Sequence, residues 1–135
     1  MNSIPTHLGN TELFEKRKVG FLASRKISTP SILPTLDWAM QVCKQTDIAI
    51  VSGFHSKMER DVLKILLQGE CGIIVVLARG MYHKLPKLYE EAMSQNRLLI
   101  ISYEKESVTR VSEATAHKRN DYVKEIADEK YSSRI

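Results

Sequence analysis

The chain has 135 residues, of which 43% are hydrophobic and 27% are charged, as is typical of one globular domain with a buried core. It contains no run of eighteen apolar residues, and its polar, acid-containing start does not resemble a signal peptide. We therefore expect a cytoplasmic protein with no membrane span. The formal net charge of +4 permits a nucleic acid or a phosphorylated ligand as partner but does not require one.

The cysteines and histidines give no sign of a metal centre. Cys43 and Cys71 stand far apart and without a partner motif, so they are expected to be buried thiols. The four histidines have neither the i,i+4 spacing nor the neighbouring cysteines of a zinc site. We therefore predict no metal and no cofactor.

The first part of the chain predicts an arm followed by a strand and a helix. Residues 1–16 are polar and without a clear period, which indicates an irregular arm with a short helical turn at Thr11–Phe14. The remainder, residues 17–135, is expected to form a single Rossmann-like domain. Lys18–Ala23 predicts a buried strand, and the apolar spacing from Ile32 to Gln45 predicts the first helix.

The stretch from Ile48 onward is the most informative in the chain. Ile48–Val51 is a short apolar run that predicts a strand, and Ser56–Gln68 has the spacing of a helix. Ser56 and Glu59 are placed as a capping box, in which a hydroxyl and a carboxylate satisfy the first backbone amides of a helix. A strand, a glycine turn and a helix start in succession favour the binding of an anion, usually phosphate.

The second half repeats the alternation of strands and helices. Ile73–Ala78 and Leu98–Ile101 predict strands, Leu85–Met93 carries the strongest helical stripe of the chain, and a closing helix is expected over Thr115–Glu129. Buried strands that alternate with helices predict an α/β fold. The expected architecture is a Rossmann-like three-layer sandwich with a mainly parallel central sheet.

Ligands of such sheets bind beyond the carboxyl ends of the strands. Hydroxyl groups, backbone amides and cations follow each predicted strand, so together they predict a basic pocket for phosphate. The alternative is that serine and glycine are simply good turn residues. The candidate binding residues are Ser24, Arg25, Ser52, Gly53, Ser56, Lys57, Arg79, Gly80, Ser102, Arg119 and Asn120.

Motifs for catalysis are absent from the sequence. It has no nucleophile elbow, no Walker A loop and no GxGxxG. Glu59 could act as a base, but the capping box explains it without chemistry. His55 could contact phosphate or act as an acid, but a lone histidine in a turn is more often solvated. We therefore predict a binding protein and not an enzyme.

Five short motifs, in order, resemble the DprA/Smf (DNA-processing protein A) family over about residues 18–127. Ala23-Ser24-Arg25 is similar to the family's Gly-Ser-Arg, and residues 52–59 align without gaps with its Ser-Gly-x-Ala-x-Gly-Ile-Asp. Gly80 and Pro86 have the family's spacing after the third strand. Ser102-Tyr103 stands where the family has Ser-Glu, and Arg119-Asn120-Asp121 resembles its Arg-Asn-Arg.

The resemblance implies single-stranded DNA binding, with Arg25, Lys57, Arg79 and Arg119 as phosphate partners. It also implies self-association, expected here as a homodimer, and a recombinase as protein partner. Lys57-Met58-Glu59 replaces the family's Gly-Ile-Asp, and no winged-helix tail is present, which indicates a minimal, diverged member.

Two other functions stay open at this point. The first is a small nucleotide-binding protein related to the LOG phosphoribohydrolases, whose Pro-Gly-Gly-x-Gly-Thr-x-x-Glu signature is missing from this sequence. The second is an assembly or regulatory protein whose pocket no longer binds a ligand and whose Trp38 and last helix face a partner.

Overall fold

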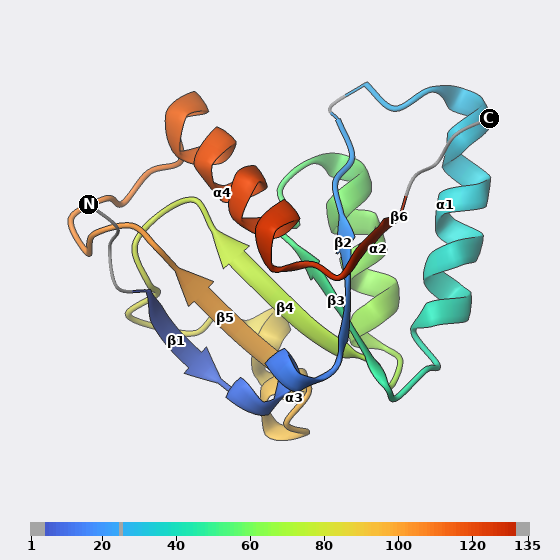
Figure 1. Cartoon of the computed structure of the whole chain (residues 1–135), viewed down its shortest axis with the longest axis horizontal. Helices are drawn as coiled ribbons and strands as arrows, with labels where there is room; N and C mark the ends of the chain where they lie inside the picture. Colours follow the sequence, from blue (N-terminus) through green and yellow to red (C-terminus); the bar gives the residue numbers. More distant parts are fainter. Residues whose placement is uncertain (1–4, 25, 132–135) are drawn as a thin grey trace.

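The computed structural model describes residues 5–24 and 26–131 and shows a central sheet between two layers of helices (Figure 1). The sheet order is β1-β5-β4-β3-β2-β6. Neighbouring strands run parallel except β1, which pairs antiparallel with β5. The strands are β1 Thr6–Gly9, β2 Arg17–Phe21, β3 Ile48–Ser52, β4 Gly72–Leu77, β5 Leu98–Ser102 and β6 Glu129–Tyr131. The predicted Rossmann-like sandwich with a mainly parallel sheet is confirmed.

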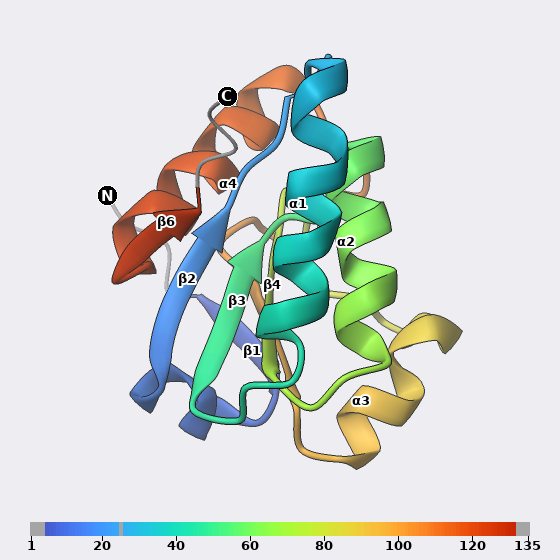
Figure 2. The same cartoon turned by 90° about the vertical axis from the view of Figure 1, so that its right-hand side faces the viewer.

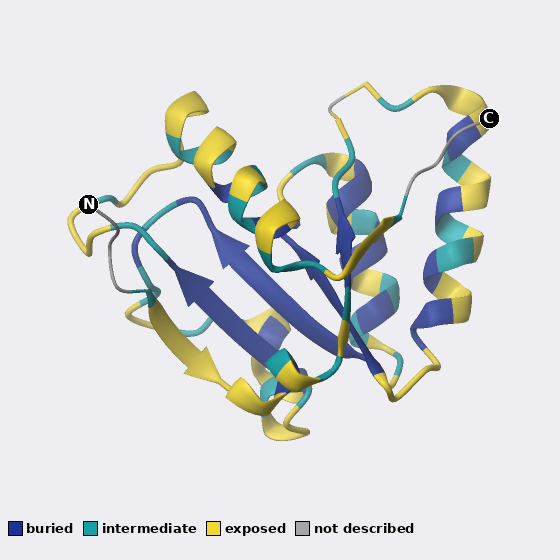
Figure 3. Ribbon diagram, in the orientation of Figure 1, coloured by how far each residue is buried: buried dark blue, intermediate teal, exposed yellow. Residues whose placement is uncertain are grey.

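The helices cover both faces of the sheet (Figure 2). On one face lie α1 Thr29–Val42, α2 Lys57–Leu67, the 3-10 helix η2 Lys87–Tyr89 and α3 Glu90–Ser94. On the other face lie α4 Glu113–Ile126 and the 3-10 helix η1 Thr11–Glu15. Alternate residues of one strand enter the two cores, with Ile48 and Ile50 in the first and Ala49 and Val51 in the second. Continuously apolar strands therefore suit this fold, because both of their faces are covered (Figure 3).

Three parts of the fold differ from the sequence-based expectation. The arm of residues 1–16 is not irregular where the structure describes it, because Thr6–Gly9 forms edge strand β1 and Thr11–Glu15 forms η1. All four residues of β1 are exposed, so the strand carries no apolar pattern. Gly9 has a φ of 110° and lies against the Leu98 carbonyl, where a side chain would not fit.

The helix expected over Leu85–Met93 is divided into η2 and α3. Pro86 has an extended ψ of 141°, so the helical segment begins only after it, at Lys87. Proline also disfavours helical geometry at the residue before it. The stripe is only partly buried, since Tyr89 and Ala92 enter the core while Leu88 is 52% exposed.

The closing helix ends at Ile126, before the predicted Glu129, and the chain then adds strand β6 beside β2. Asp128 lies between α4 and β6 and contacts β2, because its carboxylate accepts a hydrogen bond from the backbone amide of Lys18 at 2.8 Å. The three residues of β6 are polar or half-buried, so they show no alternation of apolar and polar residues from which a strand could be predicted. The two cysteines are buried thiols, as predicted.

The carboxyl end of α2 is held by one guanidinium, and we expect its removal to destabilise the fold. Arg97 donates hydrogen bonds to the carbonyls of Leu66, Leu67 and Cys71 at 3.2, 2.8 and 2.8 Å. Because Arg97 joins the last carbonyls of α2 to the carbonyl just before β4, Arg97→Ala should lower the free energy of unfolding by about 2–3 kcal/mol.

The measurement for Arg97 is urea unfolding followed by the fluorescence of Trp38, the single tryptophan. Arg97→Lys keeps the charge but lacks the planar fork, so it should recover less than half of the loss. Arg60→Ala removes an exposed arginine of α2 and should change stability by about 0.5 kcal/mol or less. A loss for Arg97→Ala no larger than that of Arg60→Ala would contradict this role.

Candidate functional site

A cavity of about 410 Å³ lies where β2, β3 and the start of α4 meet. Strands β2 and β3 run parallel, so the segments that follow them emerge at the same edge of the sheet. The cavity is lined by Ala23, Ser24, His55, Ser56, Glu59, Val111, Ser112, Glu113, Ala116, His117, Arg119 and Asn120. The lining therefore comes from three separate segments of the chain.

Two of these segments are joined by the carboxylate of Glu59, a residue that is only 4% exposed. One oxygen accepts hydrogen bonds from the backbone amides of His55 and Ser56, at 2.9 and 3.3 Å. The other accepts from the amide of Ala23 at 2.9 Å, just after β2. Ser56 completes the predicted capping box by accepting from the Glu59 amide. Glu59 thus ties the end of β2 to the turn that precedes α2, which is a structural role.

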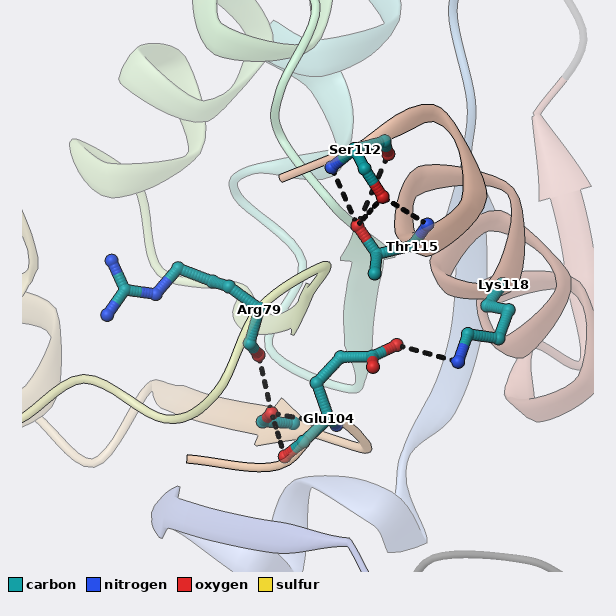
Figure 4. Close-up of polar contacts among 6 residues, drawn as sticks. Arg79, Glu104, Ser112, Thr115 and Lys118 are labelled. Atoms are coloured by element: carbon teal, nitrogen blue, oxygen red, sulfur yellow. Dashed lines mark hydrogen bonds and ion pairs between the residues drawn. The ribbon is translucent and has the colours of Figure 1, made fainter. Parts of the chain in front are cut away.

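The start of α4 is a second capped helix terminus on the same cavity (Figure 4). The Ser112 hydroxyl accepts from the Thr115 amide at 3.1 Å, and the Ser112 amide donates to the Thr115 hydroxyl at 2.9 Å. The first two amides of a helix have no intrahelical acceptor, and the cap bonds just described in α2 and α4 do not use them. Two partial positive charges of helix dipoles therefore meet at one cavity.

Arg119 brings a buried cation to this cavity and is only 6% exposed. Its Nε donates to the side-chain oxygen of Asn120 at 2.9 Å. Burial lowers the pKa of the Arg119 guanidinium, and the nearby Glu59 carboxylate acts in the opposite direction. The guanidinium stays charged at neutral pH, because arginine is not deprotonated in proteins.

Gly53 makes room for this arginine. A Cβ built on Gly53 would lie 2.5 Å from Cζ of Arg119 and closer still to Cδ and Nε. No side chain fits there unless the guanidinium moves. The glycine at the end of β3 is therefore explained by close approach of Arg119 to the backbone.

The side chains that line the cavity are not predominantly basic in the part of the chain that the structure describes. Arg119 shares the lining with the acidic residues Glu59 and Glu113, and His55 and His117 are exposed. Because the Glu59 carboxylate is already engaged by three amides, an anion would be held mainly by Arg119 and by the helix N-termini.

Six of the candidate residues predicted from sequence belong to this site. Ser24, Ser56, Arg119 and Asn120 line the cavity, and Gly53 lies directly against Arg119. Ser52 is buried behind them, where its hydroxyl accepts from the Phe54 amide at 3.0 Å. The side chain of Lys57 does not line the cavity; it is exposed and paired with Asp61 at 3.1 Å. Arg25 lies outside the described residues.

Arg79, Gly80 and Ser102 form a separate cluster at the ends of β4 and β5. The Ser102 hydroxyl donates to the Arg79 carbonyl at 2.6 Å, and the Gly80 amide donates to the Val108 carbonyl at 2.8 Å. The Arg79 guanidinium lies over the Tyr82 ring, 5.0 Å from its centre, and points away from Ser112 and Thr115 (Figure 4). None of the three lines the cavity, so phosphate binding by them stays a prediction.

Sequence reasoning missed the contribution of the residues before α4. Ser112 and Thr115 have the spacing of a capping box, a signal that could have placed the helix start two residues earlier than expected. His117 and Glu113 then follow as residues of its first turns. Within residues 5–24 and 26–131, no group of three or more metal-binding side chains comes together, and no helix is long and apolar enough to span a membrane.

The family model for DNA recombination-mediator protein A matches residues 4–130. The chain belongs to this family. Among solved structures it is similar to DNA processing protein A from Helicobacter pylori, described for its single-stranded DNA binding mode, with 21% identity and a TM-score of 0.72. It is also similar to DNA processing protein A from Streptococcus pneumoniae, with 18% identity and a TM-score of 0.68. No curated protein matches it significantly.

This member of the DNA recombination-mediator protein A family corresponds to only part of those two proteins. The matches cover 93% and 91% of this chain, but 58% and 43% of the Helicobacter and Streptococcus chains. At these identities the likeness shows the fold. The resemblance noted from the sequence motifs is thereby confirmed at the level of family and fold.

Proposed function

We propose that this DNA-processing family member binds single-stranded DNA, with a backbone phosphate in the cavity between the starts of α2 and α4. The observation that supports it is the convergence of two capped helix N-termini and buried Arg119 on one cavity. Backbone amides and a guanidinium bind a phosphate through its charge and geometry, and without reading the base. The Helicobacter relative is described as a single-stranded DNA-binding protein, which agrees with this ligand class.

The proposed function involves no catalysis. Glu59, the buried carboxylate of the cavity, is held by three backbone amides and so is poorly placed to act as a base. Within the described residues, the hydroxyls of Ser24 and Ser56 are not hydrogen-bonded to a histidine or a carboxylate, and the Ser56 hydroxyl accepts from a helix amide, so neither is paired with a base. By family membership, we further propose a cytoplasmic homodimer that delivers the strand to a recombinase.

We expect binding to weaken as salt rises. One phosphate neutralised by Arg119 should make the strand bind roughly 2.6-fold more weakly at about 200 mM than at about 50 mM salt, because each neutralised phosphate adds about 0.7 to the slope. The measurement is fluorescence anisotropy of a labelled oligothymidylate. Equal affinity at both salt concentrations would contradict phosphate binding. Lys124→Gln, at the far end of α4, serves as a control that removes one exposed positive charge.

A free nucleotide is the second candidate ligand, because a cavity of about 410 Å³ can hold a small molecule. Thymidine monophosphate added to the same anisotropy experiment separates the two. If the mononucleotide displaces the oligonucleotide at similar concentration, the site is one for nucleotides. If only a longer strand competes, the site is one for single-stranded DNA.

A further inference from the structure

A groove lies between the carboxyl ends of α1 and α2, and none of its lining residues lines the cavity described above. The two helices lie side by side on one face of the sheet (Figure 2). The groove has a volume of about 370 Å³ and is lined by Met40, Cys43, Lys44, Lys64, Ile65 and Gln68. These six residues are called the α1–α2 groove.

The floor of the α1–α2 groove is apolar, and Leu33, a second exposed apolar residue of α1, lies outside the groove. Met40 is 52% exposed, and Leu33 is 70% exposed. Because these residues are seven positions apart, they lie on the same side of the helix and about 10 Å apart along it. Amphipathic helices insert anchor side chains into grooves with this spacing. Asp37 is exposed between Leu33 and Met40 on that side, so the groove itself can receive the anchor side chains of a helix only beside Met40 and Ile65.

The rim of the groove is positively charged. Lys44 follows the end of α1 and Lys64 comes from α2, and no carboxylate lines the groove. Neither lysine forms an ion pair within the described residues. Asp37 is the single carboxylate of α1, and Asp61 of α2 is already paired with Lys57. A partner with carboxylates on both sides of an apolar stripe would complement this rim.

We propose that the α1–α2 groove binds an acidic amphipathic helix of a protein partner. A nucleic acid fits the groove less well, because the floor offers no aromatic ring for base stacking and the rim no arginine. The groove shares no lining residue with the cavity, so a partner could bind there while the cavity holds its own ligand.

The test uses the full chain with labelled methionine and isoleucine methyl groups and two synthetic helical peptides. Both peptides carry leucines at positions i, i+4 and i+7, flanked by glutamates in one and by lysines in the other. The acidic peptide should shift the NMR signals of Met40 and Ile65. The basic peptide should bind about tenfold more weakly.

Charge reversal makes the test specific. In Lys44→Glu/Lys64→Glu, the preference should invert, so that the basic peptide binds better. Lys124→Glu/Lys130→Glu is a control with the same change in net charge on α4 and β6, and it should leave the preference unchanged. All four lysines are exposed, so folding should be preserved, which the Trp38 fluorescence of each variant verifies.

Three results would overturn the proposal. The first is no shift of either methyl signal by the acidic peptide, and the second is a set of shifts that maps away from α1 and α2. The third is a shift of these same methyl signals by an oligothymidylate that also displaces the acidic peptide, which would assign the groove to nucleic acid. Loss of oligonucleotide binding at the cavity would leave this proposal unaffected, since the two sites are separate.

Discussion

Glu59→Ala is expected to lower the free energy of unfolding by about 4 kcal/mol. The carboxylate accepts hydrogen bonds from the amides of Ala23, His55 and Ser56 and is itself buried. The three hydrogen bonds are part-buried, so each lost acceptor should cost about 1 kcal/mol, at the low end of the usual range, and the capping box is lost in addition. Because the three donors lie in two separate segments, the change would also release the end of β2 from the start of α2.

Urea unfolding monitored by Trp38 fluorescence measures this loss. Glu59→Gln keeps one carbonyl oxygen, so it should lose roughly half as much as alanine. Glu113→Ala removes an exposed glutamate from the first turn of α4 and should cost less than about 1 kcal/mol, through the helix dipole alone. If Glu59→Ala were as mild as Glu113→Ala, the carboxylate would not hold the two segments together, and a functional role for it would return to consideration.

Gly53→Ala is expected to weaken oligonucleotide binding by about 10- to 100-fold with only a modest loss of stability. Its new Cβ would occupy the space of the Arg119 guanidinium, which must then leave the cavity. A charged hydrogen bond to phosphate is worth about 1.5–3 kcal/mol, which corresponds to this range. Gly9 is the single described glycine with positive φ, so alanine at position 53 brings no backbone strain.

A double-mutant cycle separates the displacement of Arg119 from other effects. Arg119→Ala alone should weaken binding about as much as Gly53→Ala. In the Arg119→Ala background, Gly53→Ala should add almost nothing, because the group that it displaces is already gone. Additive losses in the double variant would mean that Gly53 acts independently of Arg119. Wild-type affinity in Gly53→Ala would show that the guanidinium position does not matter for binding.

The sequence predicts the centre of this fold well, because local and tertiary preferences agree there. Ile48–Val51 is apolar on both faces, which suits a strand covered on two sides, and Ser56 with Glu59 specifies the helix start after it. The edge strands escape prediction for the opposite reason. All of β1 and most of β6 are exposed. Their strand conformation therefore depends on the strands they pair with, and their own composition does not predict it.

The candidate site is only half predictable, and the reason is topological. Ser24, Ser56 and Gly53 follow strands whose order along the chain already indicates a common edge. The start of α4 reaches the same cavity through the long connection from β5, and nothing local in the sequence states that Ser112 will lie opposite Ser56. Arg79, Gly80 and Ser102 sit at the correct edge, but their hydrogen bonds join β4 to β5 and to the following loop.

The most direct test of the proposed phosphate site is an amide NMR titration of the labelled protein with a short oligothymidylate. We expect the largest shifts at the first amides of both helices, those of Lys57 and Met58 in α2 and of Glu113 and Ala114 in α4, together with the Arg119 side chain. Shifts concentrated instead at Arg79, Gly80 and Ser102, with the two helix starts unchanged, would contradict the site and move it to the ends of β4 and β5.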